Sequence, residues 1–387
     1  MPMYKKTPVF IAAFLGMLLF GISLITLGSV TPHLKAKFML DGISAGTLFS
    51  ILPVGILAGS LLFGPVCDRY GYKLLLILAC VAMFAGFEGI AYASSLDILK
   101  ICVFIFGLGG GVINGATNAV VADISDEKKG ANLSLLGVFF GLGALGMPLV
   151  LGLLAHKFQP FEIVAVVGWF TLLVAFSYVF IQFPPPKLQA KNATVPWSRL
   201  FRPLLLLIAF FLFCQSSLEA IINNWATTYL ITKGVMNESN ALYALSLHIV
   251  GMIAMRLLTG SIFRSTPQIK MMWACLILLP LGILLMQTGT SKTVIIAGLV
   301  LSGAGLAGGF PIMLGFVGER FAALSGTAFS FVFVVALIGN MLINYVMGVI
   351  VHQYGVIHLT TVSYIEVIVM IVLLFFIHQK LHQPNKQ

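Results

Sequence analysis

The sequence contains very little charge for its length. Only 9% of its 387 residues are charged, whereas 59% are hydrophobic. An average soluble domain has roughly a quarter of its residues charged. Because so few charged side chains cannot cover a surface that faces water, the composition excludes a soluble protein and predicts that lipid surrounds most of the chain.

The sequence also lacks the usual signatures of catalytic and metal sites. It contains no Walker lysine, no HExxH motif and no zinc-ligand spacing, and its five cysteines are scattered without a CxxC pair. The net charge of +10 is spread over short loops, which argues against nucleic-acid binding. We therefore predict a protein that is not an enzyme and has no cofactor and no metal. The remaining alternative of a different class is a membrane sensor that moves no solute or an intramembrane enzyme.

Long apolar segments fill most of the sequence. A helix needs about twenty largely apolar residues to cross a hydrocarbon core of roughly 30 Å. Segments of this kind predict twelve spanning helices and an all-α membrane protein, at approximately residues 8–32, 43–66, 73–95, 98–122, 131–155, 162–183, 203–230, 240–263, 270–288, 294–318, 326–350 and 360–379.

The distribution of basic residues predicts the orientation of these spans. One set of loops carries fifteen Lys and Arg residues and the opposite set carries six. Since cytoplasmic loops hold the excess of positive charge, both termini are expected in the cytoplasm of a bacterial-type inner membrane. The longest polar break, 184–202, is predicted to be a cytoplasmic linker between an N-terminal bundle (1–183) and a C-terminal bundle (203–387).

The two halves resemble each other at a constant offset of 196 residues. Without gaps, this offset aligns glycine with glycine, serine with serine and one acidic residue with another, at Gly55/Gly251, Gly64/Gly260, Gly107/Gly303, Gly109/Gly305, Asp123/Glu319, Gly130/Gly326 and Ser134/Ser330. Because six spans separate the copies, each copy runs in the same direction across the membrane. Such a parallel repeat is typical of transporters whose halves rock around a site near the bilayer midplane.

The loop after the second span carries the most specific motif. It reads Gly64-Pro-Val-Cys-Asp68-Arg69-Tyr-Gly71-Tyr-Lys73 and resembles the signature loop G-x-x-x-D-R-x-G-x-R/K of the major facilitator superfamily. The resemblance implies a cytoplasmic gate in which Asp68 accepts hydrogen bonds from the start of span eleven, near Ser325-Gly326, and Arg69 pairs with Asp123. In the C-terminal copy, Gly260 remains but Arg264 and Pro267 replace the aspartate and the second glycine.

Two further stretches are similar to the fucose–galactose–glucose:proton symporters and the related sodium-dependent glucose carriers. One begins at Glu219 and contains Trp225 and Tyr229 in an E-x5-W-x3-Y-L pattern, and the other runs from Asn114-Gly-Ala-Thr-Asn118 into the fifth span. Asn114 stands where the proton-coupled members carry a glutamate, and the first span has no acidic residue. The resemblance therefore leaves both proton and sodium open as the coupling ion.

Polar side chains recur inside the predicted spans, where each must have a structural or functional reason. Gln215, Glu219 and Asn223 follow at i, i+4 and i+8 on one face of span seven. With their neighbours they form a candidate site for a neutral solute, made of Asn114, Asn118, Gln215, Asn223, Asn224, Trp225, His248, Asn340 and Asn344, with Glu219 as the candidate ion-coupling residue. Each Asn could equally serve only as an interhelical hydrogen-bonding group.

Three other ionisable residues lie in predicted spans. Glu88 and Glu366 fall on spans three and twelve, where a protonated or locally paired carboxyl is the expected state, and Arg256 is expected to pair with Glu319 or to extend to the membrane surface.

Together these features predict a monomeric secondary transporter that imports a neutral sugar or similar small polar solute by alternating access. A drug or metabolite exporter of the same superfamily is the alternative, since Gly137, Gly141, Gly146, Pro148 and Gly152 loosely resemble the exporters' span-five motif.

Overall fold

The computed structural model describes residues 4–39, 42–126, 128–154, 157–187 and 202–382. Within these ranges the secondary structure is helical, and twelve helical segments are long and apolar enough to cross a membrane. The predicted fold class and the predicted number of spans are therefore confirmed. Most of the predicted linker, residues 188–201, lies outside the described residues, so the boundary between the halves remains a prediction.

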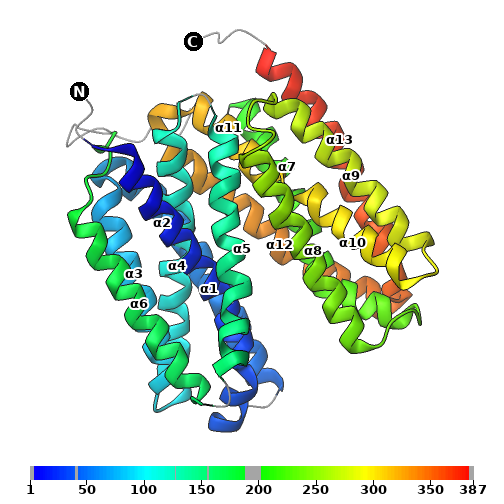
Figure 1. The fold of residues 1–387 in the computed structure, drawn as a ribbon, viewed down its shortest axis with the longest axis horizontal. Coiled ribbons are helices and arrows are strands. Elements are labelled where there is room, and N and C mark those ends of the chain that lie inside the picture. The colour runs from blue at the N-terminus through cyan, green and yellow to red at the C-terminus, as the bar shows by residue number, and fades with distance from the viewer. Residues whose placement is uncertain (1–3, 40–41, 127, 155–156, 188–201, 383–387) are drawn as a thin grey trace. The chain divides into compact units, whose positions relative to one another are not determined.

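The first six spans are single helices (Figure 1), and so are spans seven, eight, nine, eleven and twelve. Span ten is divided into α10 and α11, and short 3-10 turns precede α12 and α13. The helices are α1 (Lys6–Phe38), α2 (Gly42–Tyr70), α3 (Tyr72–Tyr92), α4 (Leu96–Ile124), α5 (Lys129–Leu154), α6 (Pro160–Phe180), α7 (Pro203–Thr232), α8 (Glu238–Gly260), α9 (Gln268–Thr288), α10 (Lys292–Leu306), α11 (Gly309–Arg320), α12 (Ser325–Tyr354) and α13 (Leu359–His382).

The chain folds into two compact units. Unit 1 comprises residues 1–126, 136–195 and 321–330, and unit 2 comprises residues 127–135, 196–320 and 331–387. Each unit therefore contains the first turns of one helix whose remainder belongs to the other unit: α12 begins in unit 1, and α5 begins in unit 2. These two helix starts are related by the 196-residue offset.

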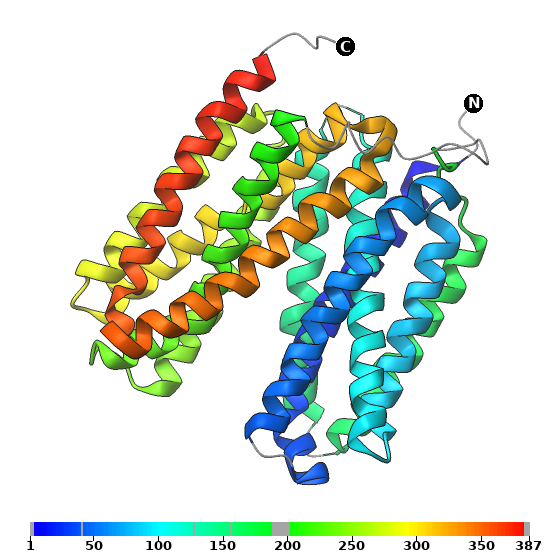
Figure 2. The same ribbon diagram turned by 180° about the vertical axis from the view of Figure 1, so that it is seen from behind.

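Glycines at the repeated positions bring the same pairs of helices together in each unit. In unit 1, α4 packs against α2 and α3, which lie beside it in Figure 2; in unit 2, α10 packs against α8 and α9. A Cβ added at Gly55 would lie 2.4 Å from the carbonyl oxygen of Phe104, and one at Gly251 would lie 2.4 Å from that of Val300. Phe104 and Val300 are themselves 196 residues apart. The repeat is thus a repeat of backbone contacts, which small residues permit in a lipid environment.

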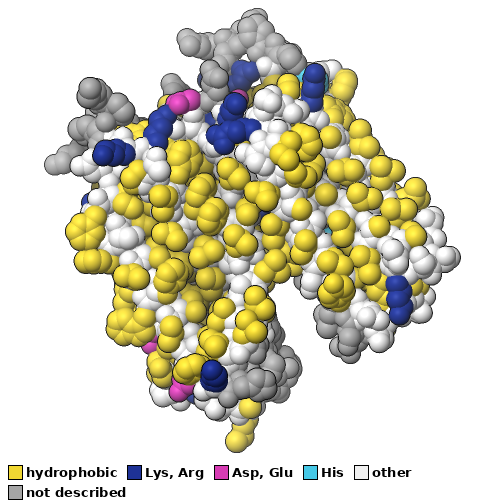
Figure 3. Space-filling model, viewed as in Figure 1, with side chains coloured by type: hydrophobic (Ala, Val, Ile, Leu, Met, Phe, Trp, Pro, Cys, Tyr) yellow, Lys and Arg dark blue, Asp and Glu magenta, His cyan; other side chains and the backbone are white. Residues whose placement is uncertain are grey.

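Large hydrophobic side chains cover the sides of the helices, and Lys and Arg gather toward the helix ends (Figure 3). On α6, for example, Trp169, Leu173 and Phe176 are each more than 60% exposed. Such surfaces would be unfavourable in water, since burying apolar area stabilises by roughly 25 cal/mol per Å². They are the expected surfaces of helices that face lipid acyl chains.

Candidate functional site

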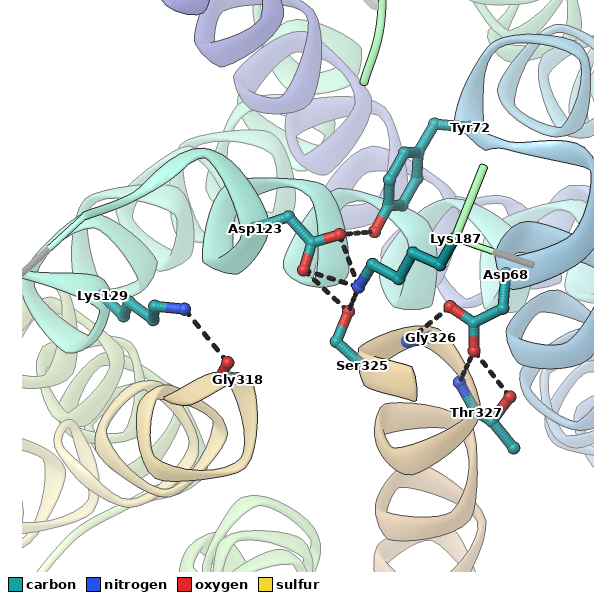
Figure 4. A network of polar contacts seen from close by, with 9 residues as sticks. All are labelled: Asp68, Tyr72, Asp123, Lys129, Lys187, Gly318, Ser325, Gly326 and Thr327. Atoms are coloured by element: carbon teal, nitrogen blue, oxygen red, sulfur yellow. Dashed lines mark hydrogen bonds and ion pairs between the residues drawn. The ribbon is translucent and has the colours of Figure 1, made fainter. Parts of the chain in front are cut away.

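Asp68, at the end of α2, lies against the first turn of α12. Its carboxylate accepts hydrogen bonds from the backbone N–H of Gly326 at 3.2 Å, the backbone N–H of Thr327 at 2.8 Å and the hydroxyl of Thr327 at 2.7 Å (Figure 4). The first N–H groups of a helix have no partner within the helix and carry partial positive charge, so a carboxylate stabilises them. The structure thus contains the contact that the signature loop implies, and Asp68 is only 1% exposed.

A second carboxylate, that of Asp123 at the end of α4, organises the neighbouring contacts. It lies 2.8 Å from the ammonium of Lys187 and accepts from the hydroxyl of Ser325 at 2.8 Å and from the hydroxyl of Tyr72. Lys187 also donates to the hydroxyl of Ser325, and its backbone N–H donates to the carbonyl of Asp68 at 3.0 Å.

The Asp68 cluster, as we call it, consists of Asp68, Tyr72, Asp123, Lys187, Ser325, Gly326 and Thr327 (Figure 4). Within unit 1, it joins the ends of α2 and α4, the start of α3, the first residues after α6 and the start of α12.

The expected pairing of Arg69 with Asp123 is wrong. The cation beside Asp123 is Lys187, whose side chain is 18% exposed, whereas the guanidinium of Arg69 lies over the ring of Tyr70. Lys187 follows the three prolines that end the sixth span, where the sequence suggested only a linker. Pro186 packs over Gly71, whose φ of 82° is readily available only to glycine. This packing directs the following lysine back into the cluster.

The remaining residues of the signature loop have structural contacts. Lys73 donates to the carbonyl of Val179 at 2.5 Å, which ties the start of α3 to the end of α6. A Cβ at Gly64 would lie 2.6 Å from the carbonyl oxygen of Gly326 and 2.8 Å from the Cα of Thr327. Glycine at position 64 therefore allows the backbones of α2 and α12 to touch beside Asp68.

In unit 2, Gln215 of α7 lies at the interruption of span ten. The Nε2 of Gln215, a fully buried residue, donates to the carbonyl of Leu306 at 2.8 Å. A Cβ at Gly309 would lie 2.4 Å from the side chain of Gln215, so a larger residue there would displace the amide of Gln215. Within the described residues, the Oε1 of Gln215 and the Oδ1 of Asn223 are buried without a hydrogen-bond donor.

Arg256, on α8, does not make the contacts expected from the sequence. Its Nε donates to the carbonyl of Ala307 across a long 3.5 Å, and the carboxylate with which it interacts electrostatically is that of Glu219, rather than that of Glu319. The side chain is 7% exposed and so does not extend to the membrane surface. Arg256 therefore lies beside the break in span ten, within unit 2.

The asparagines of α7 and α12 form a chain of amides in unit 2. Asn224 donates to the Oδ1 of Asn344 at 2.8 Å, Asn344 donates to the carbonyl of Asn340 at 2.8 Å, and Asn340 reaches the carbonyl of Ser216 at 3.5 Å. Asn224 lies among the exposed residues and Trp225 next to it is partly buried. The structure thus brings together three of the predicted site residues, Asn224, Asn340 and Asn344, through one hydrogen bond between α7 and α12 and one within α12.

The other predicted site residues make local or buried contacts. Asn118, in unit 1, donates to the carbonyl of Asn114 at 2.8 Å, one turn earlier on α4. His248, in unit 2, is fully buried, and its Nδ1 lies 3.0 Å from both the carbonyl of Leu299 and the hydroxyl of Ser302 on α10. The histidine joins α8 to α10, and Ser302 is a partner that the sequence did not indicate.

The family model described as "Major Facilitator Superfamily" matches residues 10–343 of this chain. The chain belongs to the major facilitator superfamily. Its fold agrees with that of E. coli FucP, a fucose:proton symporter, whose solved structure in an outward conformation superposes with a TM-score of 0.81 at 18% identity and covers 95% of this chain and 98% of that one.

Curated relatives share parts of the chain at lower similarity. The 4-hydroxybenzoate transporter PcaK of Pseudomonas putida is 29% identical over 43% of this chain, and the matched part is 35% of PcaK, about a third of its length. The glucose/mannose transporter GlcP of Bacillus subtilis is 27% identical over 76% of each chain. The multi-drug resistance efflux pump PmrA of Streptococcus pneumoniae is 29% identical over 41% of this chain and 39% of its own. These relatives are named as transporters, and the described residues of this superfamily member contain twelve helices that are long and apolar enough to cross a membrane.

Proposed function

We propose that this chain imports a neutral sugar or similar small polar solute by alternating access, driven by an inward proton or sodium gradient. It works as a monomer in the bacterial inner membrane, with both termini in the cytoplasm. The observation that carries the sugar assignment is the match to a glucose/mannose transporter over 76% of both chains. The amide chain of Asn224, Asn340 and Asn344 supports it, because amides supply both donors and acceptors for sugar hydroxyls.

The candidate solute site is that predicted from the sequence, Asn114, Asn118, Gln215, Asn223, Asn224, Trp225, His248, Asn340 and Asn344. Free acceptors such as the Oδ1 of Asn223 would receive hydrogen bonds from hydroxyl groups. Trp225 supplies an apolar plate for the CH face of a sugar ring.

Glu219 is the proposed ion-coupling residue. Glu219 lies within α7, inside a membrane-spanning segment, and Arg256 is the charged group that acts on it. A carboxylate inside a membrane span is costly unless it has a structural or functional reason to be there. It can take up a proton, or it can help to hold sodium in the ionised form.

The Asp68 cluster, with Gly64, Arg69, Gly71 and Lys73, is the proposed cytoplasmic gate. Asp68 and Asp123 hold the start of α12 through hydrogen bonds to three successive residues, Ser325, Gly326 and Thr327. Release of these contacts would free α12 to move, as a gate that opens on the cytoplasmic side requires.

The test is uptake of labelled glucose and mannose into proteoliposomes under an imposed inward gradient of either protons or sodium. We expect accumulation above equilibrium with one of the two gradients, and we expect Glu219→Gln to abolish accumulation while exchange of solute between the two sides continues. Glu88→Gln is the matched control, because Glu88 is a second glutamate in a membrane span. Accumulation by Glu219→Gln at the wild-type rate would exclude Glu219 as the coupling residue.

Efflux of an amphiphilic drug is the second candidate function. The relationship to PmrA over 41% of this chain favours it, as does the proline at position 148 within α5. Resistance of cells that express the protein to such drugs, together with no hexose accumulation under either gradient, would replace the sugar assignment with this one.

A further inference from the structure

A cavity of about 220 Å³ lies within unit 2, where the start of α5 meets the loop between α8 and α9. Residues of α9 and α11 complete its wall. None of the described residues that line it belongs to the candidate solute site or to the Asp68 cluster. The cavity therefore needs an explanation of its own.

Two cationic side chains line this cavity. Lys128 and Arg264 are both exposed, so an ion in solution can reach them. Arg264 donates to the side chain of Asn132 at 2.8 Å, which uses one of the five N–H donors of a guanidinium. Within the described residues, Lys128 has no ion-pair partner, and none of those that line the cavity is Asp or Glu. Two positive charges without a nearby negative charge favour an anion at this place.

The other lining residues indicate which class of anion fits. Ser265 and Thr266 add hydroxyl groups to the two cations, and such a set of donors suits the several oxygens of a phosphate group. The buried side chains of Met271 and Ile312 give the cavity an apolar part, which suits the organic portion of a phosphate ester. The volume lies below the roughly 300 Å³ at which pockets for drug-sized ligands begin, so the ligand is small.

The repeat supplies an independent reason for a negative group here. In unit 1, the backbone N–H groups of Gly326 and Thr327 bond to the carboxylate of Asp68 (Figure 4). The corresponding helix start in unit 2, at Gly130, lines the cavity, and Arg264 stands at the position that corresponds to Asp68. One copy of the repeat thus supplies its own anionic group, whereas the other copy has a cavity and a cation in its place.

We propose that this cavity binds a small phosphate ester, and that Lys128 and Arg264 hold its phosphate group. The bound phosphate would have the role that the carboxylate of Asp68 has in unit 1, and it would join the start of α5 to the loop between α8 and α9. A soluble phosphate ester and the headgroup of an anionic phospholipid both present this group. The inference goes beyond the proposed function, because it concerns neither the transported solute nor the coupling ion.

The test is thermal unfolding of the purified full-length chain in a detergent free of phospholipid, with two probes. Glycerol 3-phosphate is compared with sodium chloride at equal ionic strength. Dioleoylphosphatidylglycerol is compared with dioleoylglycerol, which lacks the phosphate. We expect one or both probes to raise the melting temperature by about 2 °C or more, because a ligand that binds only the folded chain stabilises it.

Variants of the two cations locate the effect. Lys128→Met and Arg264→Met should each raise the probe concentration that gives half of the shift by about tenfold, as expected for the loss of a hydrogen bond between charged groups. The matched control is Lys270→Met, because Lys270 is an exposed lysine of α9 that does not line the cavity. This control should leave the concentration unchanged. Thr266→Val removes only a hydroxyl, so it tests the site even if a charge variant is too unstable to purify, and we expect about a threefold increase.

The outcomes distinguish the two sources of phosphate and can overturn the inference. A shift with glycerol 3-phosphate that the cavity variants weaken indicates a soluble ester, and the same pattern with phosphatidylglycerol alone indicates a lipid headgroup. If neither probe exceeds its control, or if Lys270→Met weakens the shift as much as Lys128→Met, the inference is wrong. Since the measurement does not involve uptake, failure of the sugar assignment in proteoliposomes would leave this site unaffected.

Discussion

The ends of α2 and α8 are related by the repeat, yet the two units hold the adjacent helix start differently. In unit 1, Asp68 accepts three hydrogen bonds from Gly326 and Thr327 at the start of α12. In unit 2, the corresponding residue is Arg264, and it donates to the side chain of Asn132 at 2.8 Å. Within the described residues, no side chain accepts from the backbone N–H groups of Gly130 and Ala131, which correspond to Gly326 and Thr327.

The first residue of the helix start also has different contacts in the two units. In unit 1 this residue is Ser325, and its hydroxyl donates to Asp123, which is paired with Lys187. In unit 2 the corresponding residue is Lys129, and its ammonium donates to the carbonyl of Gly318 at 3.0 Å (Figure 4). A cavity of about 220 Å³ lies beside Arg264, Gly130 and Ala131. The comparison teaches that the repeat has preserved the approach of the helices, whereas among the described residues the carboxylate at the end of α2 has no counterpart at the end of α8, where Arg264 stands.

The largest expected difference concerns the two glycines at these contacts. A Cβ at Gly64 would meet the backbone of Gly326 and Thr327 at 2.6–2.8 Å, whereas one at Gly260 would meet the side chain of Leu135 at 2.5 Å and backbone only at 3.1 Å. Since a side chain can move and a helix backbone cannot, we expect Gly64→Ala to destabilise by about 3 kcal/mol and Gly260→Ala by about 1 kcal/mol or less. Thermal unfolding of both variants in one detergent measures this. Equal shifts in the melting temperature would mean that the two contacts are equally tight.

Removing the charge of Asp68 should have the next largest effect. Asp68→Asn replaces one acceptor oxygen with an NH2 group that faces the N–H groups of α12. We expect a loss of about 2 kcal/mol in stability, as for a buried hydrogen bond to a charged group. The control is Asp126→Asn, because Asp126 has its side chain 83% exposed and pairs with Lys6 at the surface. A loss as large in the control would show that the melting temperature responds to net charge rather than to the start of α12.

The resemblance to the superfamily's signature loop implied the contact of Asp68 with the start of span eleven, and the motif was recognisable because it occupies consecutive positions in one loop. It could not predict Lys187, since nothing in a linker that follows three prolines indicates that the chain turns back beside Gly71. The twelve spans followed from hydropathy alone, because the segments that cross lipid must be largely apolar. The partners of Arg256 did not follow, because the break at Ala307 depends on how α7 and α8 approach span ten in three dimensions.

Exchanging the charges of Asp123 and Lys187 should have a smaller effect than either single change. The side chains of Lys187 and Asp123 are only 18% and 10% exposed. Each single substitution, Asp123→Lys or Lys187→Asp, therefore places two like charges together with little access to water, and we expect each to lower stability by about 1 to 2 kcal/mol. The double exchange should recover at least half of that loss, measured by the melting temperature and by uptake. Recovery is not expected when Asp123→Lys is combined with Arg69→Asp, because the ion pair of Asp123 is with Lys187. If the double exchange lowers stability by the sum of the losses in the two single variants, the two groups act independently.

The smallest expected effect restores the missing acid in unit 2. Arg264→Asp would place a carboxylate opposite the N–H groups of Gly130 and Ala131, in the position that Asp68 has in unit 1. We expect a gain of about 0.5 to 1 kcal/mol relative to Arg264→Ala, which removes the bond to Asn132 without adding an acceptor. The gain is smaller than the contribution of Asp68, because Ala131 lacks the hydroxyl with which Thr327 donates the third bond. The melting temperatures of the two variants measure it. If these helix starts hold the protein in one conformation, Arg264→Asp should slow uptake while it raises stability. A variant that is more stable and takes up solute faster would show that this contact does not act as a gate.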